Sequence, residues 1–559
     1  MKWRVWLVRL IFVLSFGGLV ANLYFVQVNK RTILVRKVEA QMETRGFIEP
    51  IRGLIYATDK NNAPTPAVLN KEYSVIYAVP IELSDPQEAA QMISPIINKD
   101  ITTLVKAFSK SKSQYALLVE KADNDQVQKI KDLNLKGIYI KNKIFRSYPF
   151  GTMAAHIFGF ISSGDDGQVI GRYGLESFFD KELRGQEGER QGDVTITPQD
   201  GKSLYLTLDR AIQNEAEKII DSINKEWHAD GATMIVQEPS TGKILAMATV
   251  PTFDPNEYKK YELKDFLNPA VQLPYEPGSV FKVITMSAGI DAGKITPQTT
   301  YNDTGFLKLD KQWTIYNWDY TTHGAWGKIN MTNVIEHSLN VGAVFAQRQM
   351  GNNIFTEYVK KFGFGTKTGI ELPGELAGDL RNIEKGYASN YATASYGQGI
   401  TATPIQLVGS FSAIANGGVL MKPVIFSDQK PEIIRRVISQ ETAKKITDMM
   451  VSAVDVNKVA AIPQYNVAGK TGTAFTTRYN VKGYDESNLI NTYIGFAPAT
   501  NPKFTVFVKL NHPEGTPLAG QTVVPAFRDM SAFLLNYYNI SPDRVDVAKG
   551  AQTNKLFPL

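Results

Sequence analysis

Residues 275–284 read YEPGSVFKVI and place a serine at the start of an apolar helix. Pro277 and Gly278 predict a turn, and the apolar run after them predicts a buried helix. Ser279 and Lys282 lie three residues apart, so their side chains share one face of that helix. Burial lowers the pKa of a lysine, and the neutral amine can accept the proton of a serine hydroxyl. We therefore predict that Ser279 is a nucleophile and Lys282 its base.

The S-x-x-K pattern is a weak signal by itself, because it occurs five times in the chain. Its serines are Ser109, Ser222, Ser240, Ser279 and Ser427. Ser240 falls in a predicted hairpin turn, where residues three apart need not converge. Ser279 differs from the others because a turn precedes it and an apolar helix follows it. We interpret the remaining four as surface serines.

Two further motifs follow Ser279 along the chain. Ser338 and Asn340 form S-x-N in a predicted helical segment, where the hydroxyl can relay a proton and the amide can bind a peptide carbonyl. The other S-x-N, at Ser222, lies on an amphipathic helix and is interpreted as surface. K-T-G occurs at 367–369, in a turn-rich connection, and at 470–472, where it continues into a predicted strand. We assign the function to residues 470–472.

The K-T-G at 470–472 has the chemistry of a substrate-binding strand. An edge strand beside the nucleophile offers backbone N–H groups for an oxyanion hole. Gly472 lets a substrate backbone approach closely, because glycine has no side chain. Lys470 supplies a positive field, and Thr471 and Thr473 can hold a substrate carboxylate. These residues are therefore candidate substrate-binding groups.

The segments around the motifs alternate between strands and helices. Asp209 is the predicted N-cap of an amphipathic helix. Predicted strands cover 205–208, 233–238, 243–250, 467–475, 491–497 and 504–510, and a closing helix covers 525–538. We expect an all-helical insertion between the early hairpin and the late strands, and a loose tail from Ser541. This pattern predicts an α/β (α+β) enzyme with a helix-flanked sheet.

Residues 31–200 predict a separate, mixed region. Short β-like runs at 73–79, 115–119 and 138–140 alternate with helical stretches at 86–97 and 125–133. The polar, glycine-rich segment 185–194 predicts an exposed loop near a domain boundary.

The amino-terminal segment predicts a membrane anchor. Residues 10–28 read LIFVLSFGGLVANLYFVQV, which is long enough to span a bilayer. No A-x-A-like cleavage site follows, so an uncleaved signal anchor is favoured over a signal peptide. Basic residues flank both ends of the run, so charge does not decide its orientation and the catalytic chemistry must.

Composition excludes several functional classes. The chain has no cysteine, which excludes disulfides, a thiolate zinc site, an iron–sulfur cluster and a cysteine nucleophile. Its five histidines show no H-E-x-x-H spacing, so a zinc enzyme is not expected. The net charge of +6 is mild and unclustered, which argues against nucleic-acid binding. We predict no metal and no cofactor.

The ordered motifs S-x-x-K, S-x-N and K-T-G resemble those of a class B penicillin-binding protein, a membrane-anchored peptidoglycan D,D-transpeptidase. The resemblance covers nearly the whole chain. Further segments that resemble the family are RGLIY at 52–56, RSYPFG at 146–151 with AAH at 154–156, GLE at 174–176 with LRG at 183–185, YGQG at 396–399 and TPIQ at 403–406. The chain departs from the family at Ala57-Thr58, where R-G-x-I usually continues as x-D-R. Y-E-P-G-S and G-K-T-G-T resemble the division-specific (septal) branch.

The resemblance implies three parts. They are a penicillin-binding/β-lactamase-like transpeptidase domain, a mixed α/β pedestal (dimerisation-like) domain and one N-terminal transmembrane helix. The transpeptidase domain is expected to hold an antiparallel five-stranded sheet flanked by helices, with the all-helical insertion. The implied boundaries are a cytoplasmic tail at 1–9, the anchor at 10–28, the pedestal at 29–200, the transpeptidase domain at 201–540 and a tail at 541–559.

The resemblance also implies roles for the candidate residues. Ser279 attacks the carbonyl between the two terminal D-alanines of a stem peptide, and neutral Lys282 is its base. Ser338 and Lys470 pass protons to the leaving amine, while the N–H groups of Ser279 and Thr473 form the oxyanion hole. The residues that bind substrate are then Asn340, Thr471, Gly472 and Thr473.

The implied partners follow from this chemistry. A side-chain amine of a neighbouring stem peptide resolves the acyl-enzyme, and β-lactams acylate the same serine. The substrate is extracytoplasmic, so the chain after the anchor is expected to lie outside the cell membrane. The resemblance further implies a membrane-embedded glycan polymerase and divisome proteins as partners, and no nucleic acid.

Two other functions stay open from sequence. A β-lactam receptor would need a cytoplasmic effector, whereas only nine residues precede the predicted anchor. A D,D-carboxypeptidase or a β-lactamase would hydrolyse the acyl-enzyme, and class A β-lactamases do so with a glutamate in E-x-x-x-N. None of the six glutamates between Asn340 and Lys470 has asparagine four residues on, so cross-linking is favoured.

Overall fold

The computed structural model describes residues 49–109, 115–164, 168–191, 194–309, 313–477, 484–515 and 517–544, together with Trp3, Trp6, Ser15 and Phe16. The predicted anchor at 10–28 lies outside these residues, apart from Ser15 and Phe16. No helix of the described part has both the length and the apolar character needed to cross a bilayer. The chain divides into two compact units, Met1–Gly53 with Lys181–Ser203, and Leu54–Asp180 with Leu204–Leu559.

The first unit contains a hairpin of β7 (Glu189–Gln191) and β8 (Val194–Ile196). The prediction of a loop throughout 185–194 is therefore wrong. The two strands are three residues long and pair with each other, so their polar sequence offers no alternating apolar pattern to read. The Gly53 N–H of the RGLIY segment donates to Leu183 O at 2.8 Å.

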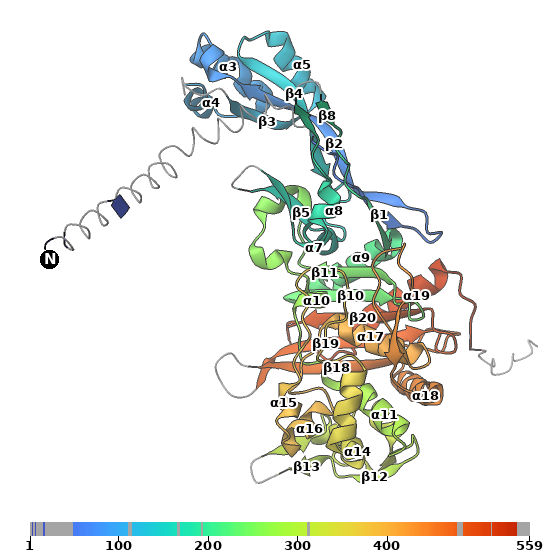
Figure 1. The fold of residues 1–559 in the computed structure, drawn as a ribbon. Coiled ribbons are helices and arrows are strands. Elements are labelled where there is room, and N and C mark those ends of the chain that lie inside the picture. Colours follow the sequence, from blue (N-terminus) through green and yellow to red (C-terminus); the bar gives the residue numbers. More distant parts are fainter. Residues whose placement is uncertain are drawn as a thin grey trace, which may run out of the picture. The chain divides into compact units, whose positions relative to one another are not determined.

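The second unit begins with a five-stranded sheet and three helices that pack on it (Figure 1). Its strands are β1 (Ile55–Thr58), β2 (Thr65–Ala78), β3 (Ala116–Ala122), β4 (Ile138–Ser147) and β9 (Leu204–Asp209). The helices are α3 (Pro86–Ile97), α4 (Ile101–Phe108) and α5 (Asn124–Leu133). Ile93, Leu104 and Ile130 are buried in the core that the helices form with β2 and β3. The strands and helices predicted here are confirmed, with β2 and β4 longer than expected, and the structure adds β1 and α4.

A second five-stranded sheet, ordered β11-β10-β20-β19-β18, is antiparallel throughout. Its strands are β10 (Gly231–Gln237), β11 (Ile244–Val250), β18 (Ala468–Thr477), β19 (Tyr484–Ala497) and β20 (Phe504–Asn511). This order places β18, which carries residues 470–472, at an edge of the sheet. The predicted hairpin and late strands are confirmed, although β19 begins seven residues before the predicted start at 491.

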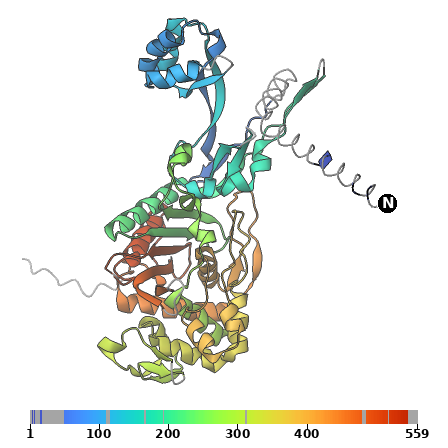
Figure 2. The same cartoon turned by 90° about the vertical axis from the view of Figure 1, so that its left-hand side faces the viewer.

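Helices cover both faces of this sheet. α9 (Arg210–Glu226) and α19 (Val523–Tyr537) lie side by side on one face (Figures 1 and 2) and bury Val506, Val508 and Leu510 of β20. Because side chains alternate along a strand, Phe507 and Lys509 point to the opposite face, where α17 (Pro404–Ala415) contacts β20. The Asp209 side chain accepts from the N–H groups of Ala211 and Ile212, which confirms the predicted N-cap.

The long insertion between β11 and β18 is not all-helical, as the sequence had suggested. It contains three two-stranded sheets, β12 (Thr300–Asp303) with β15 (Gly327–Asn330), β13 (Phe306–Lys308) with β14 (Thr314–Tyr316), and β16 (Val419–Met421) with β17 (Ile433–Arg436). These strands are only three or four residues long, too short for a period-two signal. Their pairing depends on contacts that the insertion forms as it folds.

The remaining elements complete the second unit. Before the second sheet lie α6 (Ala155–Phe158), β5 (Phe160–Ser163), β6 (Val169–Arg172), α7 (Gly174–Phe178) and, reaching into the first unit, α8 (Asp180–Arg184). The insertion holds α10 (Pro269–Gln272), α11 (Phe281–Asp291), α12 (Tyr320–His323), α13 (Met331–Glu336), α14 (Asn340–Lys361), α15 (Arg381–Glu384), α16 (Ala388–Ala394) and α18 (Gln440–Asn457). Short 3-10 turns are η2 (Pro80–Glu82), η3 (Pro255–Lys260), η4 (Leu263–Phe266) and η5 (Gly278–Val280).

The segment after α19 is held in place at its start. The Asn466 N–H donates to the Asp543 carboxylate at 2.7 Å, and Arg544 pairs with Asp455 at 2.6 Å. The prediction of a loose tail from Ser541 is therefore wrong for residues 541–544, because their partners lie far away in the sequence. Residues 545–559 lie outside the described part.

Candidate active site

Ser279 lies in η5, the turn that leads directly into α11. The Gly278 N–H donates to Gly397 O at 3.1 Å, so the YGQG segment at 396–399 holds the turn. On the other side, the backbone of Thr473 in β18 lies against Gly278. The predicted turn and apolar helix are confirmed, and they place the serine hydroxyl between α11 and the edge strand.

Lys282 is fully buried beneath Ser279. Its Nζ lies 3.0 Å from Ser279 Oγ and 3.3 Å from Ser338 Oγ, and donates to Ser338 O at 2.5 Å. Burial, followed by the nearby charge of Lys470, holds the pKa of Lys282 well below its usual range. A neutral amine has two N–H donors and one lone pair. It can therefore donate to Ser338 O while accepting the proton of Ser279.

Lys470, on β18, contacts the hydroxyl of Ser338. Its Nζ donates to Ser338 Oγ at 2.8 Å and to Thr471 O at 3.2 Å. Burial lowers the pKa of Lys470 to about 7. Ser338 has a φ of 57°, a left-handed turn between α13 and α14 that puts its hydroxyl between the two lysines. Ser279, Lys282, Ser338 and Lys470 thus form one connected chain.

The role predicted for Gly472 in substrate approach stays a prediction, and the structure adds a further reason for glycine at this position. A Cβ added there would lie 2.9 Å from Pro277 O and 3.1 Å from a methyl carbon of Val280. The missing side chain thus lets β18 approach the turn that carries Ser279. At the next residue, Thr473 Oγ1 lies 3.4 Å from Asn491 Oδ1 on β19.

Asn340 is the first residue of α14, beside Ser338. Its Nδ2 donates to Tyr316 O at 2.8 Å, and Asn317 Oδ1 accepts from the Val341 N–H at 3.0 Å. The end of β14 and the residue after it are thereby joined to the S-x-N motif. One amide N–H of Asn340 is used in this contact, while its side chain stays partly exposed.

Sequence reasoning missed Asp319. This carboxylate is buried, accepts from Trp326 Nε1 at 2.9 Å, and opposes the lowering of the pKa of Lys282. It lies in an irregular connection after β14, where no periodic pattern marks a buried acid. Across the described ranges, no group of three or more metal-ligating side chains is arranged to hold a metal ion.

The rejected motifs have other roles. In the K-T-G at 367–369, the Thr368 and Gly369 N–H groups donate to the buried carboxylate of Glu375 at 2.6 and 3.1 Å. That turn therefore binds an internal acid. Ser240 is exposed in the turn between β10 and β11, as expected.

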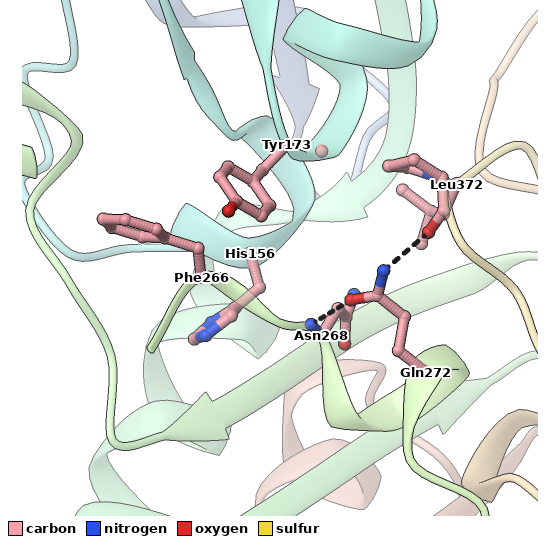
Figure 3. Close-up of a pocket in the computed structure, with 8 residues that line it drawn as sticks. His156, Tyr173, Phe266, Asn268, Gln272 and Leu372 are labelled. Carbon is pink, nitrogen blue, oxygen red and sulfur yellow. Dashed lines mark hydrogen bonds between the residues drawn. The ribbon is translucent and has the colours of Figure 1, made fainter. Parts of the chain in front are cut away.

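A small pocket is lined by residues other than those of the three motifs (Figure 3). Its lining residues are His156, Tyr173, Gly174, Phe266, Asn268, Gln272, Leu372 and Pro373. Gln272 accepts from the Asn268 N–H at 2.6 Å and donates to Pro373 O at 3.2 Å. Burial lowers the pKa of His156 to about 4, so this imidazole is neutral. The pocket is a hydrogen-bonded junction and contains no nucleophile.

Two of the family-like segments, RSYPFG and GLE, meet in a buried ion pair. Arg146 Nε lies 2.6 Å from Glu176 Oε1, with both side chains almost fully buried. Arg146 also donates to Asn70 Oδ1 at 2.9 Å. The RSYPFG and GLE segments are thus joined to β2 by charge and hydrogen bonds.

Comparison with known proteins agrees with this geometry. The model of the penicillin binding protein transpeptidase domain matches residues 232–532, and that of the penicillin-binding protein dimerisation domain matches 47–222. Stage V sporulation protein D of Bacillus subtilis is 32% identical over 98% of this chain and 88% of its own length. A probable peptidoglycan D,D-transpeptidase PenA of Neisseria meningitidis is 28% identical over 98% and 95%.

Solved structures show the same likeness. Penicillin binding protein 3 of Mycobacterium tuberculosis, complexed with aztreonam, is 26% identical with a TM-score of 0.70, covering 89% of this chain and 98% of that one. The motifs, the fold and the two matched domains lead to one conclusion: the chain belongs to the penicillin-binding protein transpeptidase family, among the class B members that carry a dimerisation domain.

Proposed function

We propose that this protein is a peptidoglycan D,D-transpeptidase that cross-links stem peptides through an acyl-enzyme on Ser279. The observation that carries the proposal is the connected chain of Ser279, Lys282, Ser338 and Lys470. Three segments far apart in sequence supply it. Several relatives are named peptidoglycan D,D-transpeptidases, which supports the same activity here.

Acylation follows from the positions of the protons. The lone pair of neutral Lys282 takes the Ser279 proton while Oγ forms a bond to the carbonyl carbon of the penultimate D-alanine. The N–H groups of Ser279 and Thr473 stabilise the oxyanion. The C–N bond to the terminal D-alanine then breaks, and its nitrogen receives a proton through Ser338 from Lys470. The products are an acyl-enzyme and free D-alanine.

Deacylation repeats this chemistry with an amine. The side-chain amine of a second stem peptide attacks the ester carbon and loses a proton through Ser338 to Lys470. The ester bond to Ser279 Oγ then breaks, Oγ takes back the proton held by Lys282, and the new amide bond is the cross-link. The groups that hold the two peptides are Asn340, Thr471, Gly472 and Thr473. A β-lactam acylates Ser279 but keeps its leaving group tethered, so the ester is expected to persist.

We further propose an anchored, extracytoplasmic enzyme with the boundaries given above: an anchor at 10–28, a pedestal at 29–200 and a transpeptidase domain at 201–540. The apolar run and the resemblance to the septal branch support this arrangement. The proposed partners are a membrane-embedded glycan polymerase and divisome proteins. Protease added outside spheroplasts is expected to digest the chain beyond residue 30, and full protection would contradict the orientation.

Penicillin labelling tests the activity. Intact mass measured after removal of free drug is expected to show a penicilloyl adduct on the wild type that survives an hour-scale chase. Ser279→Ala should abolish the adduct, whereas Ser240→Ala, the matched exposed serine, should keep it. An adduct that disappears within seconds with repeated penicillin turnover would make this protein a β-lactamase.

A further inference from the structure

The face of the second sheet that carries Lys470 also holds a lysine that the mechanism does not use. Lys509 of β20 is only 3% exposed. Burial lowers its pKa to about 8, and no neighbouring charge offsets that effect. Lysines are seldom buried so completely without a partner. Core packing alone therefore does not explain a lysine at position 509.

The strand register connects Lys509 to the active-site edge. Gly472, Thr492 and Lys509 are direct cross-strand neighbours on β18, β19 and β20. Thr233 and Thr249 continue the row across β10 and β11. All four side chains in the row are buried. A polar row therefore runs under the nucleophile's turn from one edge of the sheet to the other.

Tyr275 lies on top of this row. The Lys509 ammonium is 4.4 Å from the centroid of its ring, within the range of a cation–π contact. The Tyr275 hydroxyl lies 2.9 Å from Thr492 Oγ1. Its backbone exchanges two hydrogen bonds with Ala402, of 3.0 and 2.9 Å. Tyr275 is thus held at its ring, its hydroxyl and its main chain.

The chain from Tyr275 to Ser279 is short and held along its length. Glu276 accepts from the Gly399 N–H at 3.0 Å, and Gly278 donates to Gly397 O at 3.1 Å. Pro277 O lies against Gly472. Because residues 276–278 are fixed by these contacts, a displacement of Tyr275 is expected to displace Ser279 as well.

We propose that Lys509 is a positioning residue for acylation: its ammonium holds the Tyr275 ring on the sheet and so sets the place of Ser279 beside β18. The proposal rests on the proposed function of Ser279. On this proposal, burying the charge of Lys509 lowers the stability of the fold, while its contact with Tyr275 raises the rate of acylation. An apolar residue of similar size would avoid the burial of a charge but lose the attraction to the ring.

The proposal therefore predicts opposite changes in thermal stability and in acylation rate when Lys509 is replaced. Lys509→Met should raise the thermal unfolding midpoint and yet lower the first-order rate of acylation by a fluorescent penicillin about tenfold. The penicillin concentration for half-saturation should stay unchanged, because Lys509 does not touch the ligand. Lys509→Arg keeps a cation and should restore most of the rate. Lys503→Met, an exposed lysine before β20, is the control and should leave the rate unchanged.

A double-mutant cycle completes the experiment. Tyr275→Leu should slow acylation about as much as Lys509→Met, and the double variant should be no slower than either single variant. Additive losses, or an Lys509→Met rate equal to the wild type, would overturn the proposal. If Lys509→Met does not fold, a Tyr275→Leu variant with the wild-type rate overturns it equally. A wild type that penicillin does not acylate refutes the proposed function instead, so the two failures are distinguishable.

Discussion

Replacing Gly472 with alanine tests how closely β18 must approach the nucleophile. The added Cβ would lie 2.9 Å from Pro277 O, whereas ordinary contact begins at 3.4 Å, so the two backbones must separate by about 0.5 Å. A backbone carbonyl cannot rotate away as a flexible side chain can. A misplacement of about 1 Å can slow a reaction about 100-fold, so about 0.5 Å should slow acylation roughly tenfold. Overpacking should also destabilise the fold by about 1–3 kcal/mol.

The assay is the time course of acylation by a fluorescent penicillin, with thermal unfolding measured on the same samples. Gly520→Ala is the matched control, because an added Cβ there meets nothing within 4 Å. The Gly472→Ala protein should react about ten times more slowly than Gly520→Ala at saturating drug. Equal rates in the two variants would refute the conclusion that Gly472 sets the spacing between β18 and the turn.

Further predictions concern the lysines and the buried ion pair. Lys470→Ala should slow acylation about 100-fold or more, because it removes the proton source, whereas Lys367→Ala should leave the rate within about twofold; similar losses would contradict the assignment of the third motif. The acylation rate should fall as pH rises through about 7, where Lys470 loses its proton, and a flat profile between about pH 6 and 9 would exclude that role. Glu176→Gln should lower the free energy of unfolding in urea by about 3 kcal/mol, because Arg146 would stay buried without its counter-charge. Ser279 should still be labelled in the folded fraction of that variant, and a loss below about 1 kcal/mol would show that the pair is dispensable.

Local signals explain which elements were predictable. Asp85 caps α3 by accepting from the N–H groups of Gln87 and Glu88, and the apolar residues of that helix recur on its buried face. The predicted bounds 86–97 match the observed helix. By contrast, β12 pairs with β15 across an intervening segment that holds β13, β14 and α12. No local pattern near β12 predicts its pairing with β15, and for this reason the prediction of an all-helical insertion is wrong.

The candidate site shows the same division. Ser279, Lys282, Ser338 and Lys470 were identifiable because each has a short motif in a distinctive local setting. The choice between the two K-T-G motifs also followed from local context, since one leads into a strand and the other into turns. Asp319 and Lys509 carry no such motif, and only their burial among distant segments marks them.

Local sequence was enough to predict Ser279 as the nucleophile, Lys282 as its base, the two later motifs and the strand-and-helix pattern around them. These are properties of a few neighbouring residues: a turn before a helix, an alternating apolar strand, a capping aspartate. Local sequence could not show that Gly472 faces Pro277, that Glu375 binds the K-T-G at 367–369, or that Lys509 lies against the Tyr275 ring, because each contact joins distant segments. Contact between distant segments depends on how strands register and helices pack, and burial then sets the pKa of each lysine.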